Sequence, residues 1–339
     1  MHDLKFPDEL LLKTLRGHLD PIVIAAQNTI FAEVVSVFRE MMEQVCLLVQ
    51  LPEFMVRATA QEVKFDAAAW YEAFNEPLAT GPFSKVQLDR LMQIRERMIA
   101  EEIAANQNDE HREKVLRKRI TDSTDMLRTL CSVSEGHEYT LTGIESLLIA
   151  LMLQTWTAFE AFMTDTWVVT LNLGPKSFAR QVSAAKSDNE GKDQLRTIPL
   201  ALIEKFNFDL TKSMGFLLKE KFDFTRLRNI KDAYIAAFGY SAEPLFDTNN
   251  LNPANVAALE AVRNVFAHRG GRSDTQFREL VSNCPASEYY CLRDLEDGKK
   301  VQIDGAMVRA LWISTCANAT ALIVFLKGKE LSSDNLRDS

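Results

Sequence analysis

The sequence has few cysteines, no excess of positive charge and no long hydrophobic run, and each absence excludes a class of protein. Its five cysteines are an odd number and show no CxxC spacing, which argues against a disulfide framework and a structural zinc site. The formal net charge is -8, so the chain lacks the basic field of a dedicated nucleic-acid coat protein. Any contact with RNA must therefore come from a local group of cations.

Membrane, metal and phosphate-loop signals are also missing. The most apolar stretch carries no charge from Ser146 to Phe159, which is shorter than the roughly 18 residues of a membrane span. The N-terminal "MHDLKFPDELLLK" mixes both signs of charge, unlike a signal peptide. No HExxH, paired Cys/His spacing or P-loop glycine pattern occurs. We expect a soluble cytoplasmic protein without a metal, a cofactor or a membrane partner.

Helical periodicity dominates what is there, and it predicts an all-α helical bundle. The clearest helix begins at a capping box of Thr142 and Glu145 and stops at Gly174 and Pro175. One face of this helix is apolar and aromatic, which predicts a central strut of the bundle. The residues of that face are Leu148, Met152, Trp156, Phe159, Met163 and Trp167.

The remaining pattern predicts three segments: an N-terminal helical region of unknown role at 1–132, a helical domain at 133–330 and a disordered tail at 331–339. A helix over about 21–51 carries an apolar stripe of Ile22, Ala26, Ile30, Val34, Val37 and Met41. Two β-favouring runs flank Asp297–Gly298, which predicts a small β-hairpin near 288–303.

The stretch "LEAVRNVFAHRGGRSD" holds the residues best suited to chemistry. Asn252–Pro253 predicts the start of its helix, and Gly270–Gly271 predicts the stop. His268 suits proton transfer because histidine, as a residue type, takes up and releases a proton near working pH. Arg263 suits phosphate because its planar fork holds two oxygens. A competing interpretation is that Arg263 pairs with Glu260 while His268 satisfies the last carbonyls of the helix.

Helical geometry separates the two residues. Five residues at about 100° each place His268 about 140° around the axis from Arg263, whereas Asn264 shares the face of His268. Three explanations remain open. The helix unwinds before His268, Arg263 reaches round the helix, or the site is shared between two subunits. A two-fold axis past this helix would supply two histidines, one as base and one as acid.

The "RNVFAH" motif resembles the R-x4-H signature of the HEPN superfamily (higher eukaryotes and prokaryotes nucleotide-binding domains), in which a polar residue follows the arginine. The stretch "LLIALMLQTWTAFEAFMTDTW" resembles the long early helix of one bacterial branch, with its W-x2-FE pattern, and "HRGGRSD" also resembles that branch. The resemblance covers roughly 140–330.

This resemblance implies a helical bundle that is usually dimeric, with the motif at the subunit interface. It implies a metal-independent endoribonuclease of toxin–antitoxin or phage-defence systems, with an antitoxin or defence protein as a further partner. By carry-over, His268 is the general acid/base, Arg263 the phosphate ligand and Asn264 a supporting residue. Arg269 and Arg272 would hold the RNA backbone, and Glu160 is a further supporting candidate. The alternative is a non-catalytic scaffold that binds a nucleotide, RNA or protein.

Overall fold

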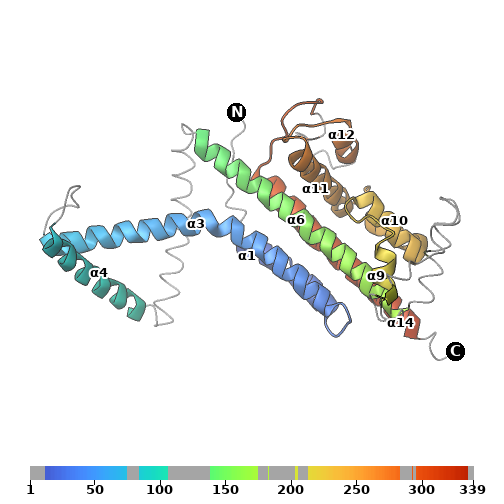
Figure 1. Cartoon of the computed structure of the whole chain (residues 1–339), viewed down its shortest axis with the longest axis horizontal. Helices are drawn as coiled ribbons and strands as arrows, with labels where there is room; N and C mark the ends of the chain where they lie inside the picture. The colour runs from blue at the N-terminus through green and yellow to red at the C-terminus, as the bar shows by residue number, and fades with distance from the viewer. Residues whose placement is uncertain are drawn as a thin grey trace. The chain divides into compact units, whose positions relative to one another are not determined.

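The aromatic face of the predicted long helix is buried, as its pattern requires. This helix is α6 (Glu138–Leu173), and its six predicted face residues from Leu148 to Trp167 are all in the core. The computed structural model describes residues 12–74, 84–105, 138–174, 182, 203–204, 213–282, 292 and 295–334. The described residues are mostly helical, which confirms the all-α prediction (Figure 1).

The chain divides into two compact units. One unit combines Met1–Val49 with Gly143–Ser339, and the other is Gln50–Thr142. The first 49 residues therefore group with the part of the chain that carries the "RNVFAH" motif, although the sequence separates them by more than two hundred residues. The predicted roles of 1–132 and 133–330 remain predictions.

The first unit begins with α1 (Leu12–Gly17), α2 (Asp20–Ala26) and the start of α3 (Ala32–Phe74). The predicted apolar stripe does not continue in phase across residues 27–31, where Asn28 adopts a φ of 59° and interrupts the helix. After this break, Ile30 and Val37 are exposed. Val34 and Met41 of the predicted stripe are partly buried against the core, and the fully buried face is Phe31, Val35, Phe38, Met42 and Val45.

Within the described residues of this unit, five further α-helices and a 3-10 helix accompany α6. They are α9 (Met214–Lys219), α10 (Leu227–Phe238), η2 (Gly239–Phe246), α11 (Leu251–His268) and α12 (Thr275–Val281), followed by α14 (Gly305–Asp334). Helix α11 packs against α12 and α14, and α14 packs against α2. Trp167 of α6 donates through Nε1 to the carbonyl of Ala233 in α10 at 3.0 Å, which ties the two helices together.

The predicted β-hairpin near 288–303 is not present in the described residues. Its turn forms, with Gly298 at a φ of 79°, but Lys300 beyond the turn pairs with Arg272 as an isolated antiparallel bridge. The Val301 N–H donates to the Gly271 carbonyl at 2.8 Å, and the Ser273 N–H donates to Lys299 at 2.9 Å. These backbone groups are thus satisfied by the segment after α11. Residues 288–291 and 293–294 lie outside the described residues.

The last helix extends into the segment predicted to be a disordered tail. It runs to Asp334 and so includes the first residues of the predicted tail, while 335–339 lie outside the described residues. Two segments, Glu145–Leu173 and Gly305–Lys329, are long and apolar enough to cross a membrane by length and composition alone. In each, 56% of the most apolar window is buried within the structure, and both supply side chains to the hydrophobic core.

The second unit contains the rest of α3 and α4 (Lys85–Ala105). Arg95 pairs with Asp66 at 3.0 Å, and Arg97 pairs with Glu72, so ion pairs connect the two helices. A capping box forms at the start of α4, where the Ser84 N–H donates to Gln87 Oε1 at 2.9 Å.

Candidate functional site

Helix α11 carries the motif without a break. It remains α-helical from Leu251 to His268 and ends at the two glycines, as predicted. Gly270 and Gly271 have φ angles of 59° and 76°, a conformation that other residues adopt at a cost. The Gly271 N–H donates to the Val265 carbonyl at 2.9 Å. This pair is therefore a helix stop, and the Gly271 N–H is already committed to the backbone.

Arg263 is half-buried and lies in a polar cluster between helices. Its Nη1 donates a hydrogen bond to Asn264 Oδ1 at 2.8 Å. The guanidinium also lies close enough to Glu260 and Glu160 to favour their ionised forms. Arg263 is therefore hydrogen-bonded to Asn264 and lies within electrostatic range of two carboxylates from different helices.

Glu260 is the buried carboxyl group of this cluster, with a residue exposure of 2%. Its Oε2 accepts the Leu227 backbone N–H at 3.1 Å, at the first residue of α10. Burial raises the pKa of Glu260, and the Leu227 N–H, Arg226, Asn264 and Arg263 all oppose that increase. The carboxylate thus occupies the N-terminal end of α10, where the helix dipole favours negative charge.

Glu160 approaches the cluster from α6. Its Oε2 accepts the Trp156 Nε1–H at 3.1 Å. Burial raises the pKa of Glu160, the Trp156 hydrogen bond and Arg263 lower it, and Asp223 raises it further. Glu160 therefore lies within electrostatic range of Arg263, its hydrogen-bond donor is the Trp156 indole, and its supporting role stays a prediction.

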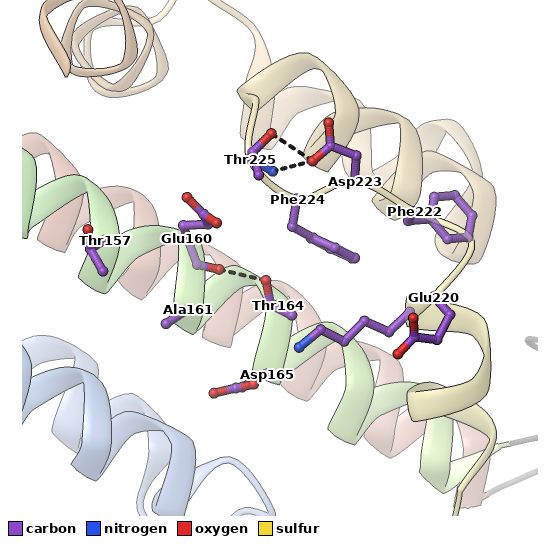
Figure 2. Close-up of a pocket in the computed structure, with 11 residues that line it drawn as sticks. Thr157, Glu160, Ala161, Thr164, Asp165, Glu220, Phe222, Asp223, Phe224 and Thr225 are labelled. Carbon is purple, nitrogen blue, oxygen red and sulfur yellow. Dashed lines mark hydrogen bonds between the residues drawn. The ribbon is translucent and has the colours of Figure 1, made fainter. Parts of the chain in front are cut away.

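Glu160 also lines a pocket of about 480 Å³ between α6 and residues 219–225 (Figure 2). Figure 2 shows Glu160 on the side of α6 that faces Phe224 and Thr225. Four carboxylates and one lysine line this pocket: Glu160, Asp165, Glu220, Asp223 and Lys219. Its charge is therefore unfavourable for a phosphate group. Burial raises the pKa of Asp165, and Lys219 opposes this.

Asp223 organises the turn that enters α10. Its Oδ1 accepts the backbone N–H of Thr225 at 2.8 Å and the Thr225 hydroxyl at 2.7 Å. Its Oδ2 accepts from Asn229 Nδ2 at 2.8 Å. Hydrogen bonds from Thr225 lower the pKa of Asp223, and those from Asn229 add to this effect. This wall of the pocket is thus held in place by local hydrogen bonds.

His268 lies apart from this cluster, at the exposed end of α11. The described part of the chain supplies no hydrogen-bond or ion-pair partner for its imidazole. Arg269 is exposed, and its Nε lies 3.5 Å from Asp274 Oδ2. Arg272 is exposed as well, and its Nη1 donates to the Gly298 carbonyl at 2.9 Å. Both predicted RNA-binding arginines thus have partners within the protein.

The structure brings Arg263 and Asn264 together, places Arg263 within electrostatic range of Glu160, and leaves His268 on another side of the same helix. Because α11 does not unwind before His268, the first of the three explanations for the motif is wrong. Glu260 was considered from sequence only as an ion-pair partner for Arg263. The sequence does contain an indication of a wider role for Glu260, because Glu260 lies one helical turn before Asn264 and residues at that spacing are neighbours on a helix surface. The described residues contain no group of His, Cys, Asp and Glu that could hold a metal ion.

Comparison with protein-family models, curated proteins and solved structures finds no match.

Proposed function

We propose that this protein is a metal-independent endoribonuclease of the HEPN type that acts as a homodimer. The observation that carries the proposal is the state of His268. It is exposed at the end of an unbroken helix, and its imidazole is unpaired within the described residues. An imidazole in this position is available to a substrate. The resemblance of "RNVFAH" to the R-x4-H signature supplies the reaction class.

In the proposed reaction, one histidine takes the proton from a ribose 2'-hydroxyl, and the 2'-oxygen attacks the adjacent phosphorus. The bond from phosphorus to the 5'-oxygen breaks, and a second histidine protonates that oxygen. The products are a 2',3'-cyclic phosphate and a 5'-hydroxyl end. Arg263 stabilises the negative charge that develops on the phosphate oxygens.

A dimer provides what one chain lacks. The described residues of one chain hold a single histidine at this helix end, while the reaction requires a base and an acid. A two-fold axis beside the C-terminal end of α11 would bring two copies of His268 together. Arg263 of each copy would then approach the phosphate from the side of the helix that carries the polar cluster. An antitoxin or defence-system protein is the further partner that this function implies, and the cytoplasm is the corresponding compartment.

Cleavage assays test this function directly. Purified protein is incubated in EDTA with single-stranded and structured RNA, beside the variants His268→Ala and Arg263→Ala. Arg228 is an exposed arginine of α10, so Arg228→Ala is a matched control. The proposal predicts cleavage that the first two variants lose and the control keeps. Cleavage that is unchanged in His268→Ala and Arg263→Ala would disprove the site.

A specific observation favours the protein-binding form of the second candidate, the non-catalytic scaffold that binds a nucleotide, RNA or a protein. Arg269 and Arg272 are engaged by Asp274 and Gly298, and the nearby pocket is rich in carboxylates. These features weaken the attraction for an RNA backbone. Binding of RNA or protein by a folded dimer without any cleavage in the same assay would support this candidate.

A further inference from the structure

The polar cluster on α11 begins one helical turn before the motif. Glu260 lies three residues before Arg263 and four before Asn264, and residues at these spacings are neighbours on a helix surface. Both polar residues therefore lie within reach of the Glu260 carboxylate. His268 is the one member of the motif outside this group.

Glu260 is held in place by a different helix. Its Oε2 accepts the backbone N–H of Leu227, the first residue of α10, at 3.1 Å. The residue at the N-cap position of α10, Arg226, provides no side-chain cap. The Glu260 side chain from α11 thus caps the N-terminus of α10. The position of Glu260 therefore depends on the packing of α10 beside α11.

The Glu260 side chain is buried among charged and polar neighbours. The residue is 2% exposed, and a buried carboxylate requires compensating partners. Arg226 and Arg263 supply positive charge near it, and Asn264 favours its ionised form. Arg263 in turn donates to Asn264 at 2.8 Å. The position of the guanidinium is therefore coupled to Glu260 directly by charge and through the Asn264 amide.

We propose that Glu260 is a positioning residue for Arg263, so that the functional unit of α11 is Glu260, Arg263, Asn264 and His268 in the pattern E-x2-R-N-x3-H. Glu260 orients the guanidinium that binds phosphate, without touching substrate. This inference rests on the proposed ribonuclease function, and it extends that function to a residue that the R-x4-H signature does not contain.

The alternative is that Glu260 only caps α10. Glu260→Gln separates the two roles, because glutamine keeps an oxygen that can accept the Leu227 N–H and removes the charge that acts on Arg263. Glu260→Ala removes both. Glu279 is an exposed glutamate of α12 in the same unit, so Glu279→Gln is the matched control.

The first measurement is RNA cleavage in EDTA, with kcat and KM determined separately on the folded fraction of each variant. We expect Glu260→Gln to lower kcat by about 10- to 100-fold, the effect of a misplaced catalytic group, while Glu279→Gln matches the wild type. In an Arg263→Ala background, Glu260→Gln should cause no further loss, because its effect acts through Arg263. Unchanged kcat in Glu260→Gln, or losses that multiply fully in the double variant, would overturn the inference.

The second measurement does not depend on activity. Thermal unfolding of the wild type, Glu260→Gln, Asn264→Ala and the double variant forms a double-mutant cycle. The positioning role predicts that the two losses in Tm do not add, and simple additivity would overturn it. If a folded wild-type protein cleaves no RNA, the ribonuclease proposal fails. The cycle then still shows whether Glu260 and Asn264 act as one unit.

Discussion

Arg263 and His268 belong to one unbroken helix and point to different surroundings. The Arg263 guanidinium is half-buried and donates to Asn264, while the His268 imidazole is exposed at the last residue of α11. Their positions differ by about 140° around an ideal helix axis. One chain therefore presents a half-buried, hydrogen-bonded cation on one side of α11 and an exposed imidazole on another.

Removal of the imidazole should affect activity and leave stability unchanged. His268 is exposed and unpaired within the described residues, so His268→Ala should change the free energy of unfolding by less than about 0.5 kcal/mol. Loss of general acid–base catalysis should lower RNA cleavage by about 10²- to 10⁴-fold. Chemical denaturation and cleavage assays on the same preparation measure both effects. A large loss of stability would instead indicate a structural histidine.

Mixed dimers should reveal whether the site is shared. If one site requires His268 from both copies, a mixture of equal amounts of wild-type and His268→Ala chains retains about a quarter of the undiluted activity after subunit exchange. Independent sites within each chain would retain about a half. The measurement is initial cleavage rate against the fraction of variant chains, with light scattering to establish that dimers form and exchange.

The two glycines after α11 should respond differently to alanine. Gly270→Ala places a side chain at a φ of 59° in open space, which costs about 1–2 kcal/mol. Gly271→Ala has a similar backbone penalty at a φ of 76°, and its Cβ would lie 2.6 Å from Phe266 Cε1. We expect a larger loss for Gly271→Ala, measured by urea denaturation. Equal losses would show that the Phe266 ring moves aside freely.

The Tyr234 hydroxyl should stabilise the packing of α10 on α6. It donates to the Met163 carbonyl at 2.8 Å and lies 2.8 Å from Thr166 Oγ1 within the core. Tyr234→Phe leaves these buried polar groups with fewer partners, at a cost of about 1–3 kcal/mol. Thermal and chemical unfolding measure the loss. Tyr240 is 79% exposed, so the control variant Tyr240→Phe should change the free energy of unfolding little.

Glu160 should make stability depend on pH. Burial raises the pKa of Glu160, so the folded protein binds this proton more tightly than the unfolded chain does. The contribution of this group to the free energy of unfolding therefore increases as the pH falls through the folded-state pKa, down to the ordinary carboxyl range near about 4.3. Below that range, both states are protonated and the contribution is constant.

The variant Glu160→Gln tests this dependence because glutamine resembles the neutral acid. We expect the Tm of the variant to exceed that of the wild type at pH 7, with a difference that shrinks on acidification. Calorimetry across this pH range measures the difference, and Glu279→Gln controls for removal of a carboxylate from the same unit. A difference that grows on acidification would contradict the raised pKa.

Local patterns predicted the elements that frame the candidate site. The buried face of α6 and the end of α11 at Gly270–Gly271 could both be predicted from the sequence, because helical periodicity and glycine stops act over a few residues. The centre of the buried N-terminal face could not be predicted, since the left-handed conformation of Asn28 interrupts the helix and the face after it is centred on Phe31, Val35 and Phe38. The predicted hairpin is not seen in the described residues, where Lys300 pairs with Arg272 after α11.

By itself, the sequence determined the helical class, the aromatic face of α6 and the extent of the helix that carries "RNVFAH". These features depend on side-chain spacing and backbone preferences within single segments. Only the tertiary structure decided that Glu260 meets Leu227 of α10 and that Arg263 lies near Glu160 of α6. It also left the His268 imidazole unpaired within the described residues. Such relationships arise when distant segments pack together, and burial then determines which polar groups must find partners.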